Sequence, residues 1–207
     1  HPDVATGLNN LAEFYKSQGN YAKAEPLYQR SLTISEKVLG PDHRSVAVIL
    51  NNLAEFYKSQ GNYAKAEPLY KRSLVISEKA LGPDHPNVAT ILNNLAENYK
   101  IQGNYAKAEP LLKRSLAISE KVLGPDHLDV AIGLNNLARL YKIQGNHSKA
   151  ESLFKRSLAI LEKALGPDHP SVATSLENLA LLYYATNREM EALELAIRAE
   201  RIRAIKR

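Results

Sequence analysis

Leu50–Leu74 reads LNNLAEFYKSQGNYAKAEPLYKRSL, and this stretch decides the fold. It holds an apolar stripe at three- and four-residue spacing, a Gly-Asn turn at residues 61–62, and a second apolar stripe. Such spacing gathers the apolar side chains on one helical face, so each stripe predicts an amphipathic α-helix. Because the turn is short, the two helices are expected to pack as antiparallel neighbours.

The same stretch recurs along the sequence, beginning at Leu8, Leu92 and Leu134, with a more divergent copy at Leu176. The period is 42 residues, marked by His1, His43, His85, His127 and His169. Repeats of 20–50 residues indicate arrays in which each unit packs mainly on its neighbours. We therefore expect an all-α solenoid (α-α superhelix) of five antiparallel helix pairs in a single array over 1–207. The repeats are about 1–42, 43–84, 85–126, 127–168 and 169–207.

Glycine and proline set the predicted helix ends. In repeat 1 the first helix, A, should end at Gly19, because glycine takes a left-handed conformation at little cost. The second helix, B, should run from about Tyr21, with Asn20 as its cap, to Leu39. The Gly-Pro-Asp-His linker should end helix B, and its Asp or His should cap the next helix A. Pro26 lies inside helix B, where we expect a local bend.

The composition excludes several classes of protein. Among 207 residues there is no cysteine, so disulfides and thiolate chemistry are excluded. No apolar run of 18 residues or secretory signal is present, which argues against a membrane span and weakly favours the cytoplasm. The net charge of +5 is interspersed and argues only weakly for nucleic acid. The start on a repeat boundary without Met suggests a fragment of a longer array.

No catalytic motif is found. The sequence has no glycine-rich phosphate loop, no G-x-S-x-G and no H-E-x-x-H. The Asp-His pairs of the linkers recur once per repeat, on the order of 10–20 Å apart in stacked helix pairs, too far to share one metal ion. We therefore predict no enzyme activity, no cofactor and no metal.

The positions that recur in the repeats carry a family likeness. The pattern L-x-x-L-A-x-x-Y-x-x-x-G-x-Y-x-x-A-x-x-x-Y, from Leu8 to Tyr28, resembles the tetratricopeptide repeat. Its extension to 42 residues, with LNNLA in helix A and EK-x-LG-x-DH in helix B and the linker, is similar to the repeats of kinesin light chains and their bacterial relatives. Departures include Leu8 where tryptophan is common. The resemblance implies a right-handed superhelix whose A helices line a concave, peptide-binding groove, and hence a non-catalytic interaction scaffold.

Two rows of asparagine on the polar face of helix A are the candidate contact surface. Asparagine costs up to about 0.7 kcal/mol relative to alanine in a helix, yet most repeats carry two in succession. An amide both donates and accepts, so such a row could hold the backbone of an extended peptide. Alternatively, the amides bridge neighbouring helices. The predicted groove residues are Asn51, Asn52, Asn93, Asn94, Lys100, Asn135, Asn136, Arg139, Lys142, Asn178, Leu181 and Tyr184.

The charges on this face change in the last two repeats. Glu13, Glu55 and Glu97 give way to Arg139, which is followed three residues later by Lys142. In repeat 5 the same two rows become Leu181 and Tyr184. This end of the groove should therefore bind a segment with an acidic residue beside an aliphatic or aromatic one, because arginine pairs with carboxylates in a bidentate manner.

Two other readings stay open. Repeats 1 and 2 match at about 35 of 42 positions, which suits a structural or engineered repeat module without a dedicated ligand. A basic stripe on helix B, such as Lys23, Arg30 and Lys37, could instead mark an RNA-binding helical repeat, although nearby glutamates favour a solvated face. The partner itself, the parent protein and the oligomeric state are not readable from the sequence.

The two ends of the array differ. Repeat 5 has charged Glu189, Glu200 and Arg207 at positions that are apolar in repeat 1, and a basic tail follows Ile197, as expected of a solvated capping helix. Repeat 1 has no such cap, so end-to-end self-association through the N-terminal repeat is predicted.

Overall fold

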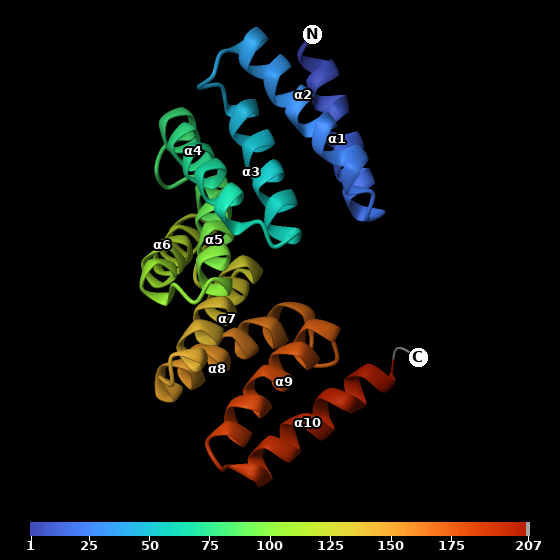
Figure 1. The fold of residues 1–207 in the computed structure, drawn as a ribbon. Coiled ribbons are helices and arrows are strands. Elements are labelled where there is room, and N and C mark those ends of the chain that lie inside the picture. Colours follow the sequence, from blue (N-terminus) through green and yellow to red (C-terminus); the bar gives the residue numbers. More distant parts are fainter. Residues whose placement is uncertain (206–207) are drawn as a thin grey trace. The chain divides into compact units, whose positions relative to one another are not determined.

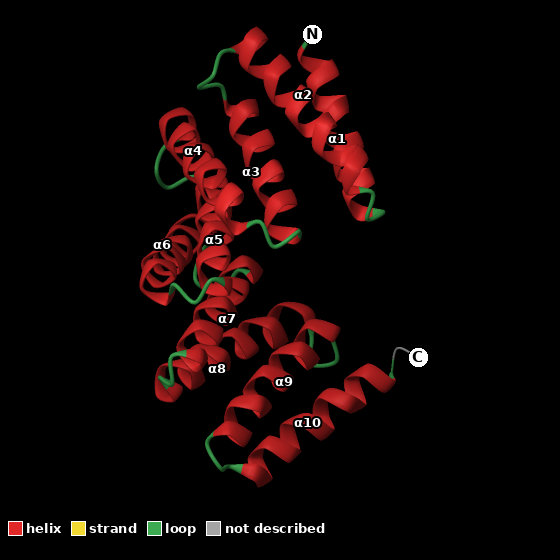
Figure 2. Cartoon of the chain, in the orientation of Figure 1, coloured by secondary structure: helices red, strands yellow, loops and turns green. Residues whose placement is uncertain are grey.

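The computed structural model describes residues 1–205, and these form ten α-helices and no strand (Figure 1). The all-α helical-repeat class predicted from the sequence is therefore confirmed. A helices of 16 residues alternate with B helices that are mostly 19 residues long, joined by short turns (Figure 2). The helices are α1 Pro2–Ser17, α2 Tyr21–Leu39, α3 Arg44–Ser59, α4 Tyr63–Leu81, α5 Pro86–Ile101, α6 Tyr105–Leu123, α7 Leu128–Ile143, α8 His147–Leu165, α9 Pro170–Ala185 and α10 Glu189–Ala204.

The protein divides into two compact units, the first His1–Asn104 and the second beginning at Tyr105. The first unit contains α1 to α5 and the second α6 to α10. Within each unit, an A helix packs on the B helix that follows it and on the B helix that precedes it. The boundary falls in the turn between α5 and α6, inside the third predicted repeat.

A buried serine ties the two helices of a repeat together. Ser73 on α4 is fully buried, and its Oγ donates to the carbonyl oxygen of Ala47 on α3 at 2.7 Å. Ser31 and Ser157 make the same bond to Ala5 and Ala131, at 2.6 and 2.7 Å. A small residue is required here because the two backbones approach closely, and a hydroxyl satisfies its own polarity by this bond.

Aromatic packing and a tyrosine hydrogen bond join one repeat to the next. Phe56 on α3 is fully buried, with its ring centroid 5.9 Å from Tyr21 and 5.4 Å from Tyr28 of α2. The neighbouring Tyr57 hydroxyl donates to Glu25 Oε1 at 2.7 Å. This bond recurs in both units, from Tyr99 to Glu67, Tyr141 to Glu109 and Tyr183 to Glu151.

The histidine of each linker is the cap of the following A helix. His43 Nδ1 accepts from the Ser45 backbone N–H at 3.1 Å, and His1, His85, His127 and His169 are placed alike. Of the two capping residues that the sequence offered, the structure thus selects the histidine. Helix B begins after an asparagine, as predicted, in repeats 1, 2 and 4. The Asn62 side chain accepts from the Lys65 backbone N–H, whereas Asn20 and Asn146 make no side-chain capping bond.

The glycines after the helices have the predicted positive φ, and α2 continues through Pro26. Gly19 has φ 70° after helix α1, and Gly40 has φ 90° and ψ 155° after α2, a region that other residues rarely occupy. Pro26 is exposed, and α2 is assigned as one helix through it. The predicted start and end of helix B, Tyr21 and Leu39, are confirmed.

The last helix has the solvated character predicted for a terminal unit. Glu189 and Glu200 are exposed, Arg198 pairs with Glu162 at 2.6 Å, and Arg203 pairs with Glu177 at 2.7 Å. The third predicted charged position, Arg207, lies outside the described residues, as does Lys206 of the basic tail.

Two glycines should respond to alanine with opposite signs. Gly7 lies inside α1 with open space around it, so Gly7→Ala should stabilise the protein by about 0.5–1 kcal/mol. Gly82 has φ 89° and ψ 156°, so Gly82→Ala should destabilise it by about 1–3 kcal/mol through backbone strain. Urea unfolding followed by circular dichroism measures both. Midpoints that move in the same direction would contradict the assigned backbone conformations.

Candidate binding surface on the A helices

The asparagine rows form a ladder of hydrogen bonds between successive A helices. Asn52 Nδ2 donates to Asn9 Oδ1 at 3.2 Å, and Asn94 Nδ2 donates to Asn51 Oδ1 at 3.1 Å. In the second unit Asn178 Nδ2 donates to Asn135 Oδ1 at 3.2 Å. The bridging role considered from the sequence is therefore present. It also explains why two asparagines follow one another, since one accepts and the other donates.

The ladder leaves part of each amide available. An amide has two N–H donors and a carbonyl oxygen with two acceptor sites, and each bond of the ladder uses one of them. Asn51, Asn52, Asn94, Asn135 and Asn178 are half-buried, as are Asn93 and Asn136 in the same rows. The ladder therefore fixes the orientation of the amides while their outer atoms still face the surface.

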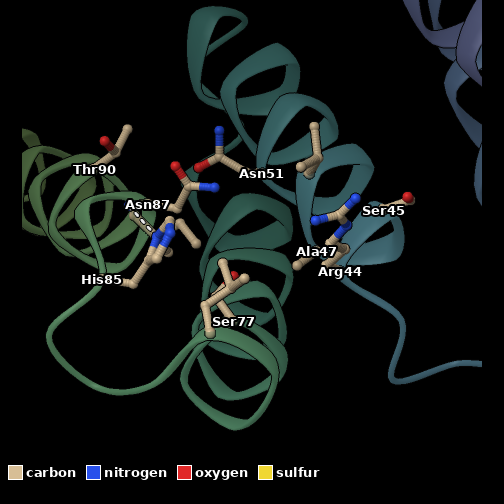
Figure 3. A pocket seen from close by; sticks show the side chains of 11 residues that line it. Arg44, Ser45, Ala47, Asn51, Ser77, His85, Asn87 and Thr90 are labelled. Carbon is tan, nitrogen blue, oxygen red and sulfur yellow. Dashed lines mark hydrogen bonds between the residues drawn. The ribbon is translucent and has the colours of Figure 1, made fainter.

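Three equivalent hollows lie beside the first asparagine row, between consecutive A helices and the end of the intervening B helix. The α3–α5 hollow, of about 400 Å³, contains Asn51 in its wall (Figure 3). The α1–α3 hollow, of about 190 Å³, contains Asn9, and the α7–α9 hollow, of about 250 Å³, contains Asn135. Hollows that recur with the repeat could each receive a side chain of an extended segment.

Sequence reasoning missed most of the lining of these hollows. The row three residues before the first asparagine contributes Thr6, Val48, Thr90, Ile132 and Thr174. A usable signal was present, because Val48 and Ile132 are large apolar residues on the polar face of their helices and are 50% and 56% exposed. The contribution from the ends of the B helices, such as Leu81 and Leu165, depends on packing that no local pattern reveals.

The glutamate row further along the A helices has a structural partner. The Tyr70 hydroxyl on α4 donates to Glu55 Oε1, and Lys58 Nζ lies 2.6 Å from the same carboxylate. Burial, and then the bond to Glu55, raise the pKa of Tyr70. Repeat 1 has the same arrangement of Tyr28, Glu13 and Lys16. These glutamates therefore receive a hydroxyl from helix B and a cation from their own helix.

Repeat 4 loses both halves of this arrangement. Phe154 stands where Tyr28 and Tyr70 stand, and Arg139 stands where Glu13 and Glu55 stand. Arg139 is exposed, Lys142 is half-buried, and neither forms an ion pair within residues 1–205. Burial, with Arg139 nearby, lowers the pKa of Lys142. The predicted positive end of the surface is thus present without a compensating carboxylate.

Lys100 is the predicted contact residue with the least exposed side chain. It is 7% exposed, and its Nζ lies 2.5 Å from Glu97 Oε2, which satisfies its charge within the helix. Leu181 and Tyr184, in contrast, are 56% and 69% exposed. With Leu193 and Ala196 of α10 they line a further hollow of about 410 Å³, which is largely apolar.

In repeats 2 and 4, two of the three cations of the basic stripe on the B helix pair with acidic residues of the preceding repeat. Arg72 pairs with Glu36 of the preceding B helix at 2.6 Å, and Arg156 pairs with Glu120 at 2.6 Å. Lys79 and Lys163 pair with Asp42 and Asp126 of the preceding linkers, at 2.6 and 2.5 Å. These contacts support the solvated-face interpretation, because a nucleic-acid surface needs cations that are free to meet phosphates.

No metal centre or membrane-spanning helix is found in the part of the protein that the structure describes. No cluster of three His, Asp or Glu side chains there is suited to hold an ion. The described helices are too short or too polar to cross a bilayer.

Glu151 on α8 joins three other side chains of the second unit. It accepts from the Tyr183 hydroxyl and from Arg188 Nη1, both at 2.9 Å, and Lys155 Nζ lies at 2.7 Å. Arg188 also stacks on the Tyr183 ring, at 3.7 Å from its centroid. Lys155, then Arg188 and Tyr183, lower the pKa of Glu151 to about 2. This cluster fixes α9 and α10 against α8.

Stability should therefore fall in acid partly through Glu151. Its pKa is depressed in the folded state, so its contribution is present above the unfolded value, about 4.3, and is lost as pH falls toward 2. Glu151→Gln should cost about 1–2 kcal/mol at pH 7 and almost nothing at pH 2. Urea unfolding at a series of pH values tests this, with Glu194→Gln on exposed α10 as the control. A cost for Glu151→Gln that does not change with pH would contradict it.

The repeats match a known family and several solved structures. A family model described as the tetratricopeptide repeat matches residues 3–74, 45–121, 87–163 and 144–204. No curated protein matches. Among solved structures, BtubC (BKLC) from P. vanneervenii is 28% identical with a TM-score of 0.88, over 99% of this protein and 82% of that one.

Two further structures extend the comparison. A candidate kinesin light chain from Podosopora anserina, with nearly identical TPR-like repeats, is 29% identical with a TM-score of 0.86. The match covers 100% of this protein and 98% of that one. MamA is 17% identical with a TM-score of 0.65, over 94% and 95% of the two proteins, and shares the fold alone.

Proposed function

The protein belongs to the tetratricopeptide-repeat family, with repeats of the kinesin-light-chain-like type, and we propose that it is a non-catalytic scaffold that binds an extended peptide segment of a partner protein. The tetratricopeptide-repeat fold is consistent with protein–protein interaction. The binding surface consists of the asparagine rows of the A helices and the hollows beside them. The asparagine amides contact the backbone of the peptide, and the hollows receive its side chains.

The observation that carries the preference for an acidic segment is the uncompensated pair of cations on α7. Ile132, Asn135, Arg139 and Lys142 follow one another at three- and four-residue spacing, so they share one face of α7. Ile132 opens on the α7–α9 hollow, and Arg139 lies seven residues on, about 10 Å along the helix. An extended peptide spans that distance in about three residues. A peptide with an aliphatic residue and an acidic residue at that separation would place the first in the α7–α9 hollow and the second at Arg139.

A charge reversal on α7 should remove this binding. Peptides selected from a random library on the unaltered protein should be acidic. The double variant Arg139→Glu with Lys142→Glu should lower the affinity for these peptides by at least about ten-fold. The matched control is Arg30→Glu with Lys37→Glu, which makes the same charge change on exposed α2 residues that form no ion pair within residues 1–205. Fluorescence anisotropy measures each affinity. Unchanged affinity for every selected peptide in the α7 variant would refute the proposed site.

The first repeat supports the proposal of self-association. Val4, Leu11 and Phe14 on α1 are 48%, 42% and 57% exposed, whereas Val46, Leu53 and Phe56, their equivalents in repeat 2, are at most 4% exposed. The Phe56 ring packs against Tyr21 and Tyr28 of the preceding repeat. In repeat 5 the equivalent positions are Glu189 and Ala196, which offer no aromatic ring to Phe14. We propose that two α1 faces meet, rather than α1 meeting the last repeat.

Sedimentation velocity over a range of concentrations tests this pairing. The unaltered protein should associate as concentration rises, Phe14→Glu should stay monomeric, and Leu193→Glu on α10 should associate like the parent. A parent that is monomeric throughout would exclude self-association. Loss of association in Leu193→Glu would show that the last repeat is the partner surface instead.

A further inference from the structure

The three equivalent hollows differ in chemistry at the residue that begins the A helix. This residue is Pro2 in the α1–α3 hollow, Arg44 in the α3–α5 hollow and Leu128 in the α7–α9 hollow. At the end of the B helix, the α3–α5 hollow has Ser77 where the α7–α9 hollow has Leu161. Arg44 therefore gives the α3–α5 hollow a basic rim where the α7–α9 hollow has Leu128, although polar residues such as Ser171 and Thr174 also line the latter.

The charge of Arg44 is uncompensated. Its guanidinium makes no ion pair or hydrogen bond within residues 1–205, and no acidic residue lines the hollow. Asp42, the nearest acidic residue before it in sequence, is paired with Lys79 at 2.6 Å, and that contact lowers the pKa of Asp42. Arg44 is exposed, so it can turn toward a ligand without leaving water for an apolar core.

The other polar groups of the hollow supply further donors. Asn51 Oδ1 already accepts from Asn94, which directs the Asn51 amino group outward as a donor. His85 Nδ1 accepts from the Asn87 backbone N–H at 3.1 Å, so the neutral ring carries its hydrogen on Nε2. Figure 3 shows Arg44 and Asn51 on α3 across the opening from His85 and Asn87 at the start of α5.

We propose that the α3–α5 hollow is a carboxylate pocket that receives a glutamate side chain of the bound peptide. Arg44 is the specificity-determining residue, Asn51 donates a second hydrogen bond, and the apolar wall of Val48 and Leu81 contacts the methylene groups of the glutamate. The equivalent α7–α9 hollow, with Leu128 and Leu161, takes an aliphatic side chain instead. The inference rests on the proposed peptide binding and adds the identity of one side chain.

A single carboxylate probe tests the pocket without any partner peptide. N-acetyl-glutamate amide should cause saturable NMR shifts of the Arg44 Nε–H and the Asn51 side-chain amide, and the uncharged N-acetyl-glutamine amide should not. Arg44→Leu should abolish the shifts at Asn51. Acetylated glycine with a free carboxyl group should bind more weakly, because it lacks the methylene groups that contact the apolar wall. Absence of saturable shifts, equal shifts with the glutamine analogue, or tighter binding of acetylated glycine would overturn the inference.

Peptides selected on the unaltered protein provide the second test. Replacing each glutamate by glutamine should identify one position whose loss costs about ten-fold in the parent and less than about two-fold in Arg44→Leu. The exchanged variant, Leu128→Arg, is the matched control, because it places arginine in the aliphatic hollow at an equivalent helix start. If peptides bind but no glutamate couples to Arg44, the carboxylate pocket is wrong while the proposed scaffold function stands. If Arg139→Glu with Lys142→Glu has no effect while the probe still shifts Asn51, the proposed α7 site is wrong and the carboxylate pocket stands.

Discussion

The hydrogen bond from a buried serine of helix B to an alanine carbonyl of helix A is the constraint on which the repeat depends. Two smooth apolar helices can slide along one another at little cost, but a buried hydroxyl must find its acceptor or lose about 1–3 kcal/mol. Ser31, Ser73 and Ser157 therefore fix the axial position of the helix pairs in repeats 1, 2 and 4. Once the pair is fixed, the tyrosine–glutamate hydrogen bonds between repeats position the next helix pair, as the bond from Tyr57 to Glu25 does. The asparagine ladder and the hollows beside it are consequences of that register.

The sequence predicted the helices well because their limits are set locally. The 3.6-residue apolar periodicity, together with glycines at positive-φ positions, predicted the ends of helix B of repeat 1 at Tyr21 and Leu39, as observed. It predicted the surface less well, because the same residue types serve inside and outside contacts. Asn52 and Asn94 were predicted as contact residues for a peptide, yet their amides bond the neighbouring A helix. Lys100 looks like its half-buried counterparts Lys58 and Lys142 in sequence and is buried in the structure. The hollows escaped prediction since they are formed by residues from three helices.

The surface that results has a uniform part and an individual part. The uniform part is the pair of asparagine rows, which repeats 1 to 4 carry in full and which, under the proposed function, would offer amides to an extended backbone. The individual part consists of the positions where neighbouring repeats differ, such as Arg44, Arg139 and Leu181. Under the proposed function, each repeat would select one side chain of the peptide, while the asparagine amides would bind its backbone. The ion pairs of the B helices, in contrast, join neighbouring repeats, so the cations in them are already paired with carboxylates of this protein.

The pairing of a helix B tyrosine with a helix A glutamate has a consequence for how these repeats diverge. A repeat that lost the carboxylate first would keep a buried hydroxyl without its acceptor, so the two positions cannot drift independently. Repeat 3 retains Glu97 but has Leu112 at the tyrosine position, and Lys100 holds the carboxylate there. Repeat 4, with Phe154 and Arg139, has given up both. Repeats 2, 3 and 4 thus form a series in which the hydroxyl is absent first and the carboxylate is then replaced by arginine. A change of charge on the A-helix surface would thus be tolerated in a repeat that has already lost the tyrosine–glutamate hydrogen bond.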